Sequence, residues 1–577
     1  MRVRMGRLKA LVLLTAALGA AVLVWIALAL PPRPLVLPPP AWEAPPALVR
    51  GVLHVHSARS DGSGTVDDIA AAAARAGLDF VVLTDHGDGT RAPDPPAYHS
   101  GVLCLDGVEI STRDGHYAAI GMARAPYPLG GEARDVVEDV RRLGGFGIAV
   151  HPDSQKQELR WTAWDAPFDA IEWLNTDSEW RDESAAGLLA LLPGYPLRGA
   201  AAIVRAFRRP AELLARWDEL ARLRPVVALA GADAHARFGA AARRDPYRGF
   251  TLPGFPSYES SFRVFSVGVQ TARPFTKSAA EDATLLIDAL RSGRAFTALD
   301  ALAGPAVFEF TAESGASRVA AGGRLDTEGP VTFRARVNAP PGSTIVLWGN
   351  GRPVAQAAGA SLSYAAKPEP GAYRVEVQTP GAPGSPPVPW LVGNPIYVGA
   401  AAIGASPARA LQPATHTLAI LDPDRLSEWH VEHEALSEAR VTRAEPPAER
   451  GCLFAYRLQP GEPAGQFAAL ARPLEPGSVL TADRIRFRAR SAAPMRLSVQ
   501  VREPRGRDGQ RWQRSVYLDE EPREVTVLLD DMRPIGPTDS ERPVRARIDS
   551  LLLVIDTTNA LGGTTGWVWL SDVRLEK

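Results

Sequence analysis

Cysteine is scarce in this chain: its 577 residues include two, Cys104 and Cys452. They lie far apart in the sequence, which argues against a disulfide framework. Net charge is small as well, at −1, so the composition gives no indication of nucleic-acid binding, and no nucleic-acid partner is expected. A chain of this length has room for about three to four domains.

The N-terminus carries a long apolar run, from Ala10 to Leu30, preceded by several basic residues. Its length is about what a membrane-spanning helix needs, and the positive charge before it predicts an exported remainder. Ala27-Leu28-Ala29 is a candidate cleavage site. An uncleaved anchor, which the length favours, and the signal peptide of a secreted protein therefore both stay open for residues 1–30. Prolines in residues 31–47 predict an extended spacer.

Histidine is also scarce, with ten in the chain, but six of them belong to one ordered series between residues 52 and 236. Imidazole and carboxylate groups together suit Zn²⁺, Mn²⁺ or Fe²⁺. Nine such ligands are too many for one ion, so we expect two or three divalent metal ions and hydrolytic chemistry. The nine are His54, His56, Asp61, His86, Glu109, His116, His151, Asp233 and His235. The other histidines, His99, His416, His430 and His433, are expected in loops or on the surface.

Most of these residues follow apolar runs that are typical of buried strands, at residues 48–53, 80–83, 146–150 and 226–230. His54 and His56, two residues apart on a strand, point to the same face. Helical stretches are predicted at residues 66–76, 132–143 and 211–223. Strands that alternate with helices and carry polar residues at their ends predict an α/β barrel with its site on the C-terminal face.

The ordered motifs resemble the PHP (polymerase and histidinol phosphatase) family over about residues 48–300. They are His54-x-His56, Ser60-Asp61-Gly62, Thr84-Asp85-His86, Gly107-x-Glu109, His116, His151-Pro152 and Asp233-x-His235. The resemblance implies a distorted (βα)7 barrel with a trinuclear site that hydrolyses phosphoesters. Residues 310–398 further resemble the carbaryl-hydrolase-like branch, which includes carbamate-ester cleavage. Phosphoester and carbamate or ester substrates therefore both stay open.

The resemblance also implies a role for each ligand. His54, His56, Glu109 and Asp233 would hold one metal, and Glu109 would bridge to a second, held by His116 and His151. Asp61, His86 and His235 would hold a third. We expect a metal-bound hydroxide as nucleophile, Glu109 as the bridging catalytic carboxylate, and Asp85 as a supporting group or proton shuttle. Phosphate sites usually add cations, and Lys156, Arg160 and Arg237 lie near the motifs.

Alternating runs after the barrel, which spans residues 48–304, predict two all-β sandwich modules at residues 305–400 and 418–577, joined by a linker at 401–417. The second module resembles galactose-binding-like jelly rolls, which often bind carbohydrate by aromatic stacking. Its candidates are Trp429, Trp512, Trp567 and Trp569, although a tryptophan in such a strand is more often a core residue.

Two functions stay open. One is an exported, membrane-anchored hydrolase of a small-molecule or polymer-derived ester. The other is a cell-surface binding protein with an inactive PHP scaffold and a carbohydrate-binding module. The complete ligand set favours the hydrolase.

Overall fold

The computed structural model describes residues 2–577 apart from positions 44, 46, 182, 192, 243–244, 400–411, 422, 445–449, 461–464, 476 and 506–508. Most of the predicted linker at residues 401–417 thus lies outside the described residues. The chain forms two compact units. Unit 1 comprises Met1–Gly87, Pro93–Ala123 and Val137–Ser406, and unit 2 comprises Asp88–Ala92, Arg124–Val136 and Pro407–Lys577.

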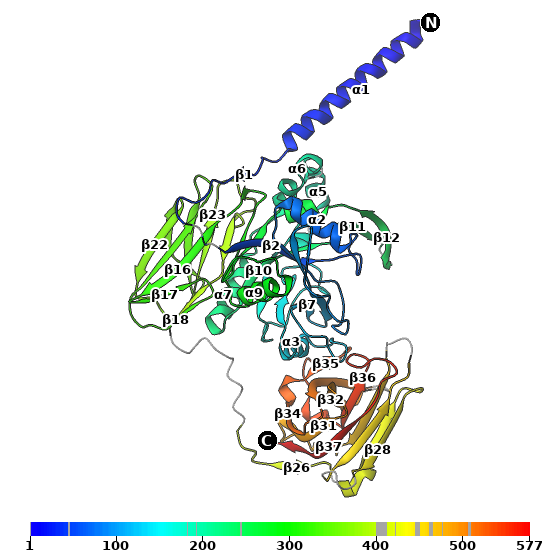
Figure 1. Ribbon diagram of the computed structural model, residues 1–577. Coiled ribbons are helices and arrows are strands. Elements are labelled where there is room, and N and C mark those ends of the chain that lie inside the picture. Colours follow the sequence, from blue (N-terminus) through cyan, green and yellow to red (C-terminus); the bar gives the residue numbers. More distant parts are fainter. Residues whose placement is uncertain are drawn as a thin grey trace. The chain divides into compact units, whose positions relative to one another are not determined.

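Unit 1 is built on a closed barrel of strands (Figure 1). Parallel pairs join β8 to β9, β9 to β10, β10 to β2 and β2 to β3, whereas β7 runs antiparallel to both β6 and β8. A bridge between His86 and Glu109 links the end of β3 to β6. These strands are β2 (Leu48–Val55), β3 (Phe80–Leu83), β6 (Val108–Thr112), β7 (Gly115–Ile120), β8 (Phe146–Ala149), β9 (Ala170–Asn175) and β10 (Val227–Ala234).

Helices between the strands lie close to their predicted positions. Helix α2 (Val66–Ala76) is capped at its N-terminus by Thr65, whose hydroxyl accepts a hydrogen bond from the backbone N–H of Asp68. Its C-terminal cap is Gly77, in the left-handed conformation. The predicted mixed α/β class is confirmed, and the antiparallel β7 makes the barrel irregular. The three predicted helices are α2, α3 (Ala133–Arg142) and α7 (Ala211–Leu223), and the chain also forms α4 (Thr176–Arg181), α5 (Ala185–Leu191), α6 (Tyr195–Ile203), α8 (Tyr258–Phe262) and α9 (Ala279–Arg291).

The strands between residues 305 and 398 belong to the same unit as the barrel. One group forms a four-stranded sheet, β17-β16-β19-β22. The others extend the barrel's own strands, because β24 pairs with β14, β14 with β13, and β13 with β2. The predicted boundary at residues 304–305 therefore does not divide two units. The strands are β13 (Ser266–Gln270), β14 (Ala295–Ala298), β16 (Phe308–Ser314), β17 (Ser317–Ala320), β19 (Val331–Val337), β20 (Thr344–Gly349), β21 (Arg352–Ala358), β22 (Ser361–Ala366), β23 (Gly371–Gln378), β24 (Leu391–Gly393) and β25 (Ile396–Val398).

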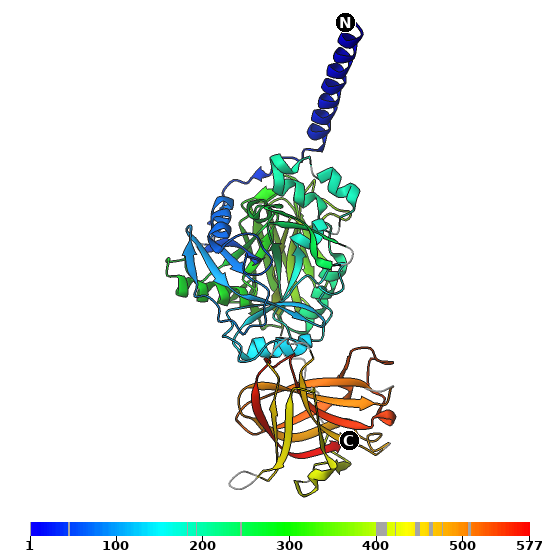
Figure 2. The same cartoon turned by 90° about the vertical axis from the view of Figure 1, so that its right-hand side faces the viewer.

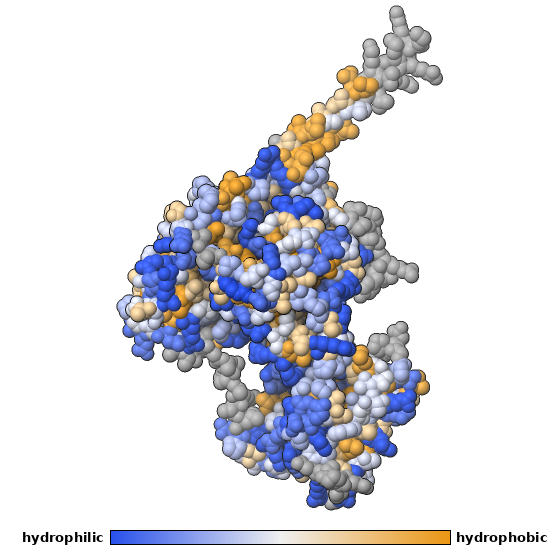
Figure 3. Space-filling view, in the orientation of Figure 1, coloured by the Kyte–Doolittle hydropathy of each residue, from blue (hydrophilic) through white to orange (hydrophobic). Residues whose placement is uncertain are grey.

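The N-terminal run folds as helix α1 (Arg2–Ala29), with exposed apolar side chains such as Leu18 (Figure 3). Among the residues that the structure describes, no helix is both long and apolar enough to span a bilayer. The following proline-rich segment is not the free spacer expected from its composition. Its strand β1 (Leu35–Val36) pairs in parallel with β15 (Ala303–Gly304), and Leu37 is buried.

Unit 2 contains two sheets of antiparallel strands that enclose an apolar core (Figure 2). The first has the order β28-β29-β37-β31-β34, with β26 paired to β37, and the second β27-β30-β36-β32-β33-β35. This confirms the predicted β-sandwich character. The first sheet comprises β26 (Thr417–Ala419), β28 (Glu438–Arg443), β29 (Cys452–Arg457), β31 (Arg484–Ser491), β34 (Arg523–Leu528) and β37 (Thr565–Glu576). The second comprises β27 (His430–His433), β30 (Phe467–Pro473), β32 (Met495–Glu503), β33 (Gln510–Leu518), β35 (Arg533–Ile535) and β36 (Ser550–Asp556).

Candidate metal centre

The barrel strands bring all nine predicted ligands to one place. β2 supplies His54 and leads into His56, β6 and β7 supply Glu109 and His116, and β10 supplies Asp233. Four overlapping groups each have ligand atoms within 4.8 Å of one another. They are His56/Asp61/His86/His235, His54/Glu109/His151, His54/His56/Asp233 and His86/Glu109/His116.

Glu109 lies at the centre of this cluster and its two oxygens face different histidines. Oε1 lies 2.7 Å from Nδ1 of His116 and 3.1 Å from Nε2 of His151. Oε2 lies 3.2 Å from Nε2 of His54 and 3.1 Å from Nε2 of His56. A carboxylate shared in this way has the arrangement of a ligand that bridges two ions.

The third predicted group lies on the open side of the cluster. The Asp61 side chain is 46% exposed and the His86 side chain 36% exposed, whereas Glu109 is fully buried. Oδ2 of Asp61 is 3.2 Å from Nε2 of His235 and 3.7 Å from Nε2 of His86. Solvent therefore reaches the cluster from the side of Asp61 and His86.

His56 tests whether these residues fit a metal. Its Nε2 is buried and has no hydrogen-bond partner, although carboxylate oxygens of Glu109 and Asp233 lie 3.1 and 3.3 Å away. An imidazole nitrogen buried without a hydrogen bond is costly unless it has another partner. A cation between this nitrogen and the two carboxylates would supply one, so the donor set fits divalent ions.

Electrostatics in the cluster point the same way. Burial opposes the charged form of His54, but Glu172, Asp233 and Glu109 raise its pKa well above the ordinary value. Burial likewise opposes charge on His56, yet the adjacent carboxylates of Asp233 and Glu109 raise its pKa to about 10. The histidines in turn hold the pKa of Glu109 well below its usual range despite burial. The carboxylates thus attract positive charge strongly enough to overcome desolvation.

Three of the ligands have unusual backbone conformations. His54, His151 and Asp233 have positive φ angles of 64°, 43° and 47°. Residues other than glycine rarely adopt this region, and such strain concentrates at functional sites. For His54 it coincides with a register shift where β2 pairs with β3, between Val52 and Val55.

Two buried polar residues at the end of β9 complete the site, and sequence reasoning missed both. Oε1 of Glu172 lies 2.6 Å from Nδ1 of His54, and its Oε2 accepts a 2.9 Å hydrogen bond from the backbone N–H of His151. Asn175 donates from Nδ2 to Oδ2 of Asp233 over 3.3 Å. A glutamate inside an otherwise apolar stretch, Ala170-Ile171-Glu172-Trp173-Leu174, was the signal that could have revealed them.

Asp85 occupies a different place from the ligands. Its carboxylate accepts hydrogen bonds from the backbone N–H and hydroxyl of Ser57, at 2.8 and 2.7 Å, and from the hydroxyl of Ser60, at 2.6 Å. These contacts organise the loop that carries Asp61. The geometry thus favours the supporting role for Asp85 over proton transfer.

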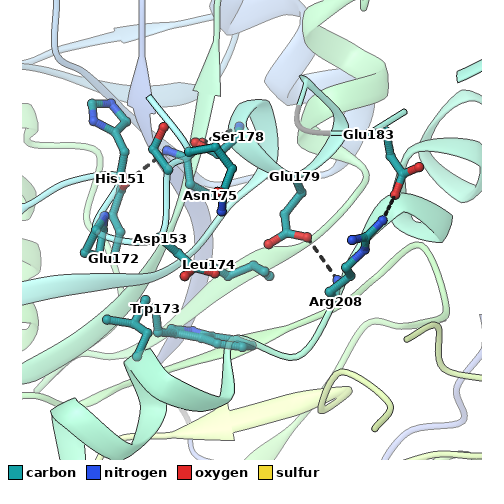
Figure 4. A pocket seen from close by; sticks show the side chains of 14 residues that line it. His151, Asp153, Glu172, Trp173, Leu174, Asn175, Ser178, Glu179, Glu183 and Arg208 are labelled. Carbon is teal, nitrogen blue, oxygen red and sulfur yellow. Dashed lines mark hydrogen bonds and ion pairs between the residues drawn. The ribbon is translucent and has the colours of Figure 1, made fainter. Parts of the chain in front are cut away.

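Of the three cations predicted near the motifs, Arg160 binds the main chain, and Lys156 and Arg237 are exposed. Arg160 donates to the carbonyl oxygen of Ser154 over 2.5 Å. Next to the cluster lies a cavity of about 410 Å³ whose wall includes His151 and Glu172 (Figure 4). At its other end the backbone N–H of Arg208 donates to Glu179, and its guanidinium pairs with Glu183.

The tryptophans predicted as a carbohydrate platform are mostly core residues. Trp429, Trp512 and Trp569 are 5%, 0% and 2% exposed, respectively, so their rings are not available for stacking. Trp567 is partly exposed on β37, with the Arg490 guanidinium 5.5 Å from its ring centre. Of the four candidates, Trp567 alone is placed to stack on a ligand.

Comparisons with known proteins do not show a family for this chain. No protein-family model matches it, and neither does any curated protein. Solved structures that match a part of it include carbohydrate-binding modules. The family 11 module of cellulosomal cellulase Lic26A-Cel5E of Clostridium thermocellum is 15% identical, with a TM-score of 0.24, and the match covers 28% of this chain and 95% of that one. The mannan-recognising module TmCBM27 is 12% identical, with a TM-score of 0.21, over 29% and 97%. Likenesses this small carry no argument about function.

Proposed function

We propose that the chain is a metal-dependent hydrolase of the PHP type whose barrel binds two or three divalent ions. The observation that carries this proposal is the convergence of nine ligands from separate strand ends around the buried carboxylate of Glu109. Nε2 of His56 is buried beside carboxylate oxygens of Glu109 and Asp233, at 3.1 and 3.3 Å, and this donor set suits a divalent cation.

Bound Zn²⁺, Mn²⁺ or Fe²⁺ would supply Lewis acidity and a nucleophile derived from water at neutral pH. The protein's part is positioning. Glu109 presents one oxygen to each side of the cluster, and Asp61 and His86 form the open edge at which a substrate enters. Because this edge is partly exposed while Glu109 and His56 are buried, the attacked bond would lie at the rim of the cluster.

The bond to be cleaved is a phosphoester or a carbamate or ester. A substrate that extends from the open edge into the cavity next to His151 would meet carboxylates of Asp153, Glu172, Glu179 and Glu183 against one guanidinium, Arg208, which favours the uncharged class. An acidic wall would disfavour a multiply charged phosphate through repulsion between like charges. We therefore propose the carbamate or ester reaction first and the phosphoester reaction second.

The test is an assay of the full chain, loaded with Mn²⁺, Zn²⁺ or Fe²⁺, on a panel of aryl carbamates and aryl esters and on a panel of phosphoesters. The proposal expects turnover that EDTA abolishes and metal restores. The variant His99→Gln is a control for histidine loss, since His99 lies outside the cluster and pairs with Asp67. If neither panel shows metal-dependent turnover, the proposed hydrolase function is contradicted.

Carbohydrate binding by unit 2 is a second candidate function, favoured by the partly exposed Trp567 beside Arg490. An indole face next to a guanidinium can stack against a sugar ring and donate to its oxygens. Affinity electrophoresis of the full chain in gels containing soluble polysaccharides tests it. Trp567→Ala should remove any retardation, whereas Leu480→Ala, at another exposed apolar side chain, should not. If the wild-type chain migrates equally in gels with and without each polysaccharide, this function is ruled out.

The site of action is proposed to be outside the cytoplasm. Support comes from the basic residues before Ala10 and the apolar run up to Leu30, which folds as α1. Positive charge before an apolar segment orients the remainder of a chain for export. The substrate would then be a small-molecule or polymer-derived ester met at the cell surface or beyond it.

A further inference from the structure

The end of strand β9 carries two buried side chains, Glu172 and Asn175, that contact one another and reach three of the ligands. Nδ2 of Asn175 donates to Oε2 of Glu172 over 3.0 Å. The same carboxylate accepts the backbone N–H of His151 and approaches the ring of His54, while Asn175 donates to Asp233. Glu172 and Asn175 also form part of the cavity wall drawn in Figure 4.

These contacts go to a particular subset of the ligands. His54, His151 and Asp233 are the three ligands with positive φ, and each is tied to this pair. A strained backbone persists when the surrounding structure over-determines it. The pair on β9 supplies such a restraint, because it holds residues that come from β2, from the end of β8 and from β10.

Glycine at position 231 shows how closely the fold is built around Glu172. A Cβ atom at Gly231 would lie 1.7 Å from Oε1 of Glu172, so any other residue would displace the carboxylate. Gly231 lies two residues before Asp233 on β10. The strand that carries a ligand therefore also provides the space for the carboxylate that holds two others.

We infer that Glu172 and Asn175 are a positioning pair that orients His54, His151 and Asp233 for the buried ions, without binding metal themselves. This inference rests on the proposed metal-dependent function. Carboxylates hydrogen-bonded to the second nitrogen of a ligand histidine fix its tautomer and ring orientation. Here one carboxylate orients the ring of His54 and the main chain of His151 together.

The inference predicts an unequal effect within the cluster. Asp61, His86 and His235 lie on the open side, where the loop contacts of Asp85 arrange the segment that carries Asp61. Loss of the β9 pair should therefore weaken binding of the buried ions and spare the ion on the open side.

The test measures metal binding in Glu172→Gln, Asn175→Ala and the control Glu183→Gln, all in the full chain. Glu183 lines the same cavity and pairs with Arg208, so its variant controls for loss of a nearby carboxylate. Equilibrium dialysis against Mn²⁺ or Zn²⁺ buffers, followed by elemental analysis, gives the affinity of each ion. Glu172→Gln should weaken one or two ions by about 10- to 100-fold and leave one unchanged. Asn175→Ala should do so by less.

Thermal unfolding of the metal-free proteins separates positioning from folding. The inference expects the metal-free variants to unfold close to the wild type, with Glu183→Gln unchanged in both measurements. Wild-type affinity in both Glu172→Gln and Asn175→Ala would overturn the inference while leaving the hydrolase in place. The inference would also be overturned if, in both variants, the loss of metal binding is explained entirely by unfolding of the protein. A wild-type chain that binds no metal would instead overturn the proposed function on which the inference rests.

Discussion

At the scale of single residues, the order of the motifs predicted the nine candidate ligands because most of them follow apolar strands and each carries a donor suited to a metal. The structure brings all nine together. Glu172 and Asn175 were not predicted, since their role depends on contacts with residues 21 to 118 positions away that no local pattern records. Alternation along a strand separates its two faces but does not show which face is buried. The sequence therefore could not assign Trp512 and Trp569 to the core or to the surface.

Glu109→Gln tests the bridging role directly. The change keeps the shape of the side chain and removes the negative charge that faces His54, His56, His116 and His151. Loss of a residue that only hydrogen-bonds to a metal ligand already lowers metal affinity or activity by about 10- to 100-fold. Loss of a bridging ligand should therefore lower turnover by at least about 100-fold. Turnover at the wild-type level, in a protein that remains folded by circular dichroism, would refute the assignment.

Asp300 gives a pH-dependent prediction away from the metals. Burial raises its pKa from 3.8 to about 6, against the opposing effects of Ser266 and Arg50, and its Oδ1 has no hydrogen-bond partner. A carboxyl whose pKa is higher in the folded state stabilises the fold below about pH 4, and that contribution is lost as the pH rises through 6. Asp300→Asn should therefore raise the free energy of unfolding at pH 7 by about 1–3 kcal/mol. Parallel unfolding curves for variant and wild type from pH 4 to 7 would contradict this.

At the scale of elements, α2 and α7 have the bounds that periodicity predicted, and β3 coincides with its apolar run. Local pattern is sufficient there because each element buries one face or its whole length. The pairing of β24 with β14 was not predictable, since it joins residues about a hundred positions apart. Backbone pairing also explains why the proline-rich segment is not a free spacer: Leu35 and Leu37 donate to the carbonyl oxygens of Leu302 and Gly304.

A buried ion pair joins helix α7 to strand β23 and carries the prediction at this scale. The Arg374 guanidinium donates to both oxygens of Asp218, at 2.6 and 2.8 Å, and also to Glu376. Asp218→Ala should lower the free energy of unfolding by about 3–5 kcal/mol, because it leaves a buried charge without its main partner. Glu219→Ala on the same helix removes an exposed partner of Arg216 and should cost at most about 1 kcal/mol. Equal effects in denaturant titrations would refute the role of this pair.

At the scale of the whole molecule, the sequence predicted an α/β barrel followed by β modules, and the structure merges the first of these modules with the barrel in one unit. Alternation along a strand indicates that one face is buried but not which part of the chain covers it. The presence of two β regions was therefore predictable, whereas the strands with which each region pairs were not. Membrane attachment through α1 stays a prediction.

Export is tested by cell fractionation of the full chain. Leu18→Arg places a charge within the apolar run and should disfavour insertion by roughly 2.5 to 3.5 kcal/mol on the translocon scale. The variant should therefore leave more protein in the cytosol. Arg33→Leu, after the run, should not. Wild-type protein found wholly soluble in the cytoplasm with residues 1–30 intact would rule out both the anchor and the signal peptide.

The metal content of the purified full chain tests the central claim most directly. After weakly held ions are removed by dialysis, elemental analysis should find two to three transition-metal ions per chain, falling by at least one in Glu109→Gln. The convergence of nine candidate ligands, with Nε2 of His56 buried beside the carboxylates of Glu109 and Asp233, is the reason for this expectation. A value below one ion per chain in the wild-type protein would contradict the account.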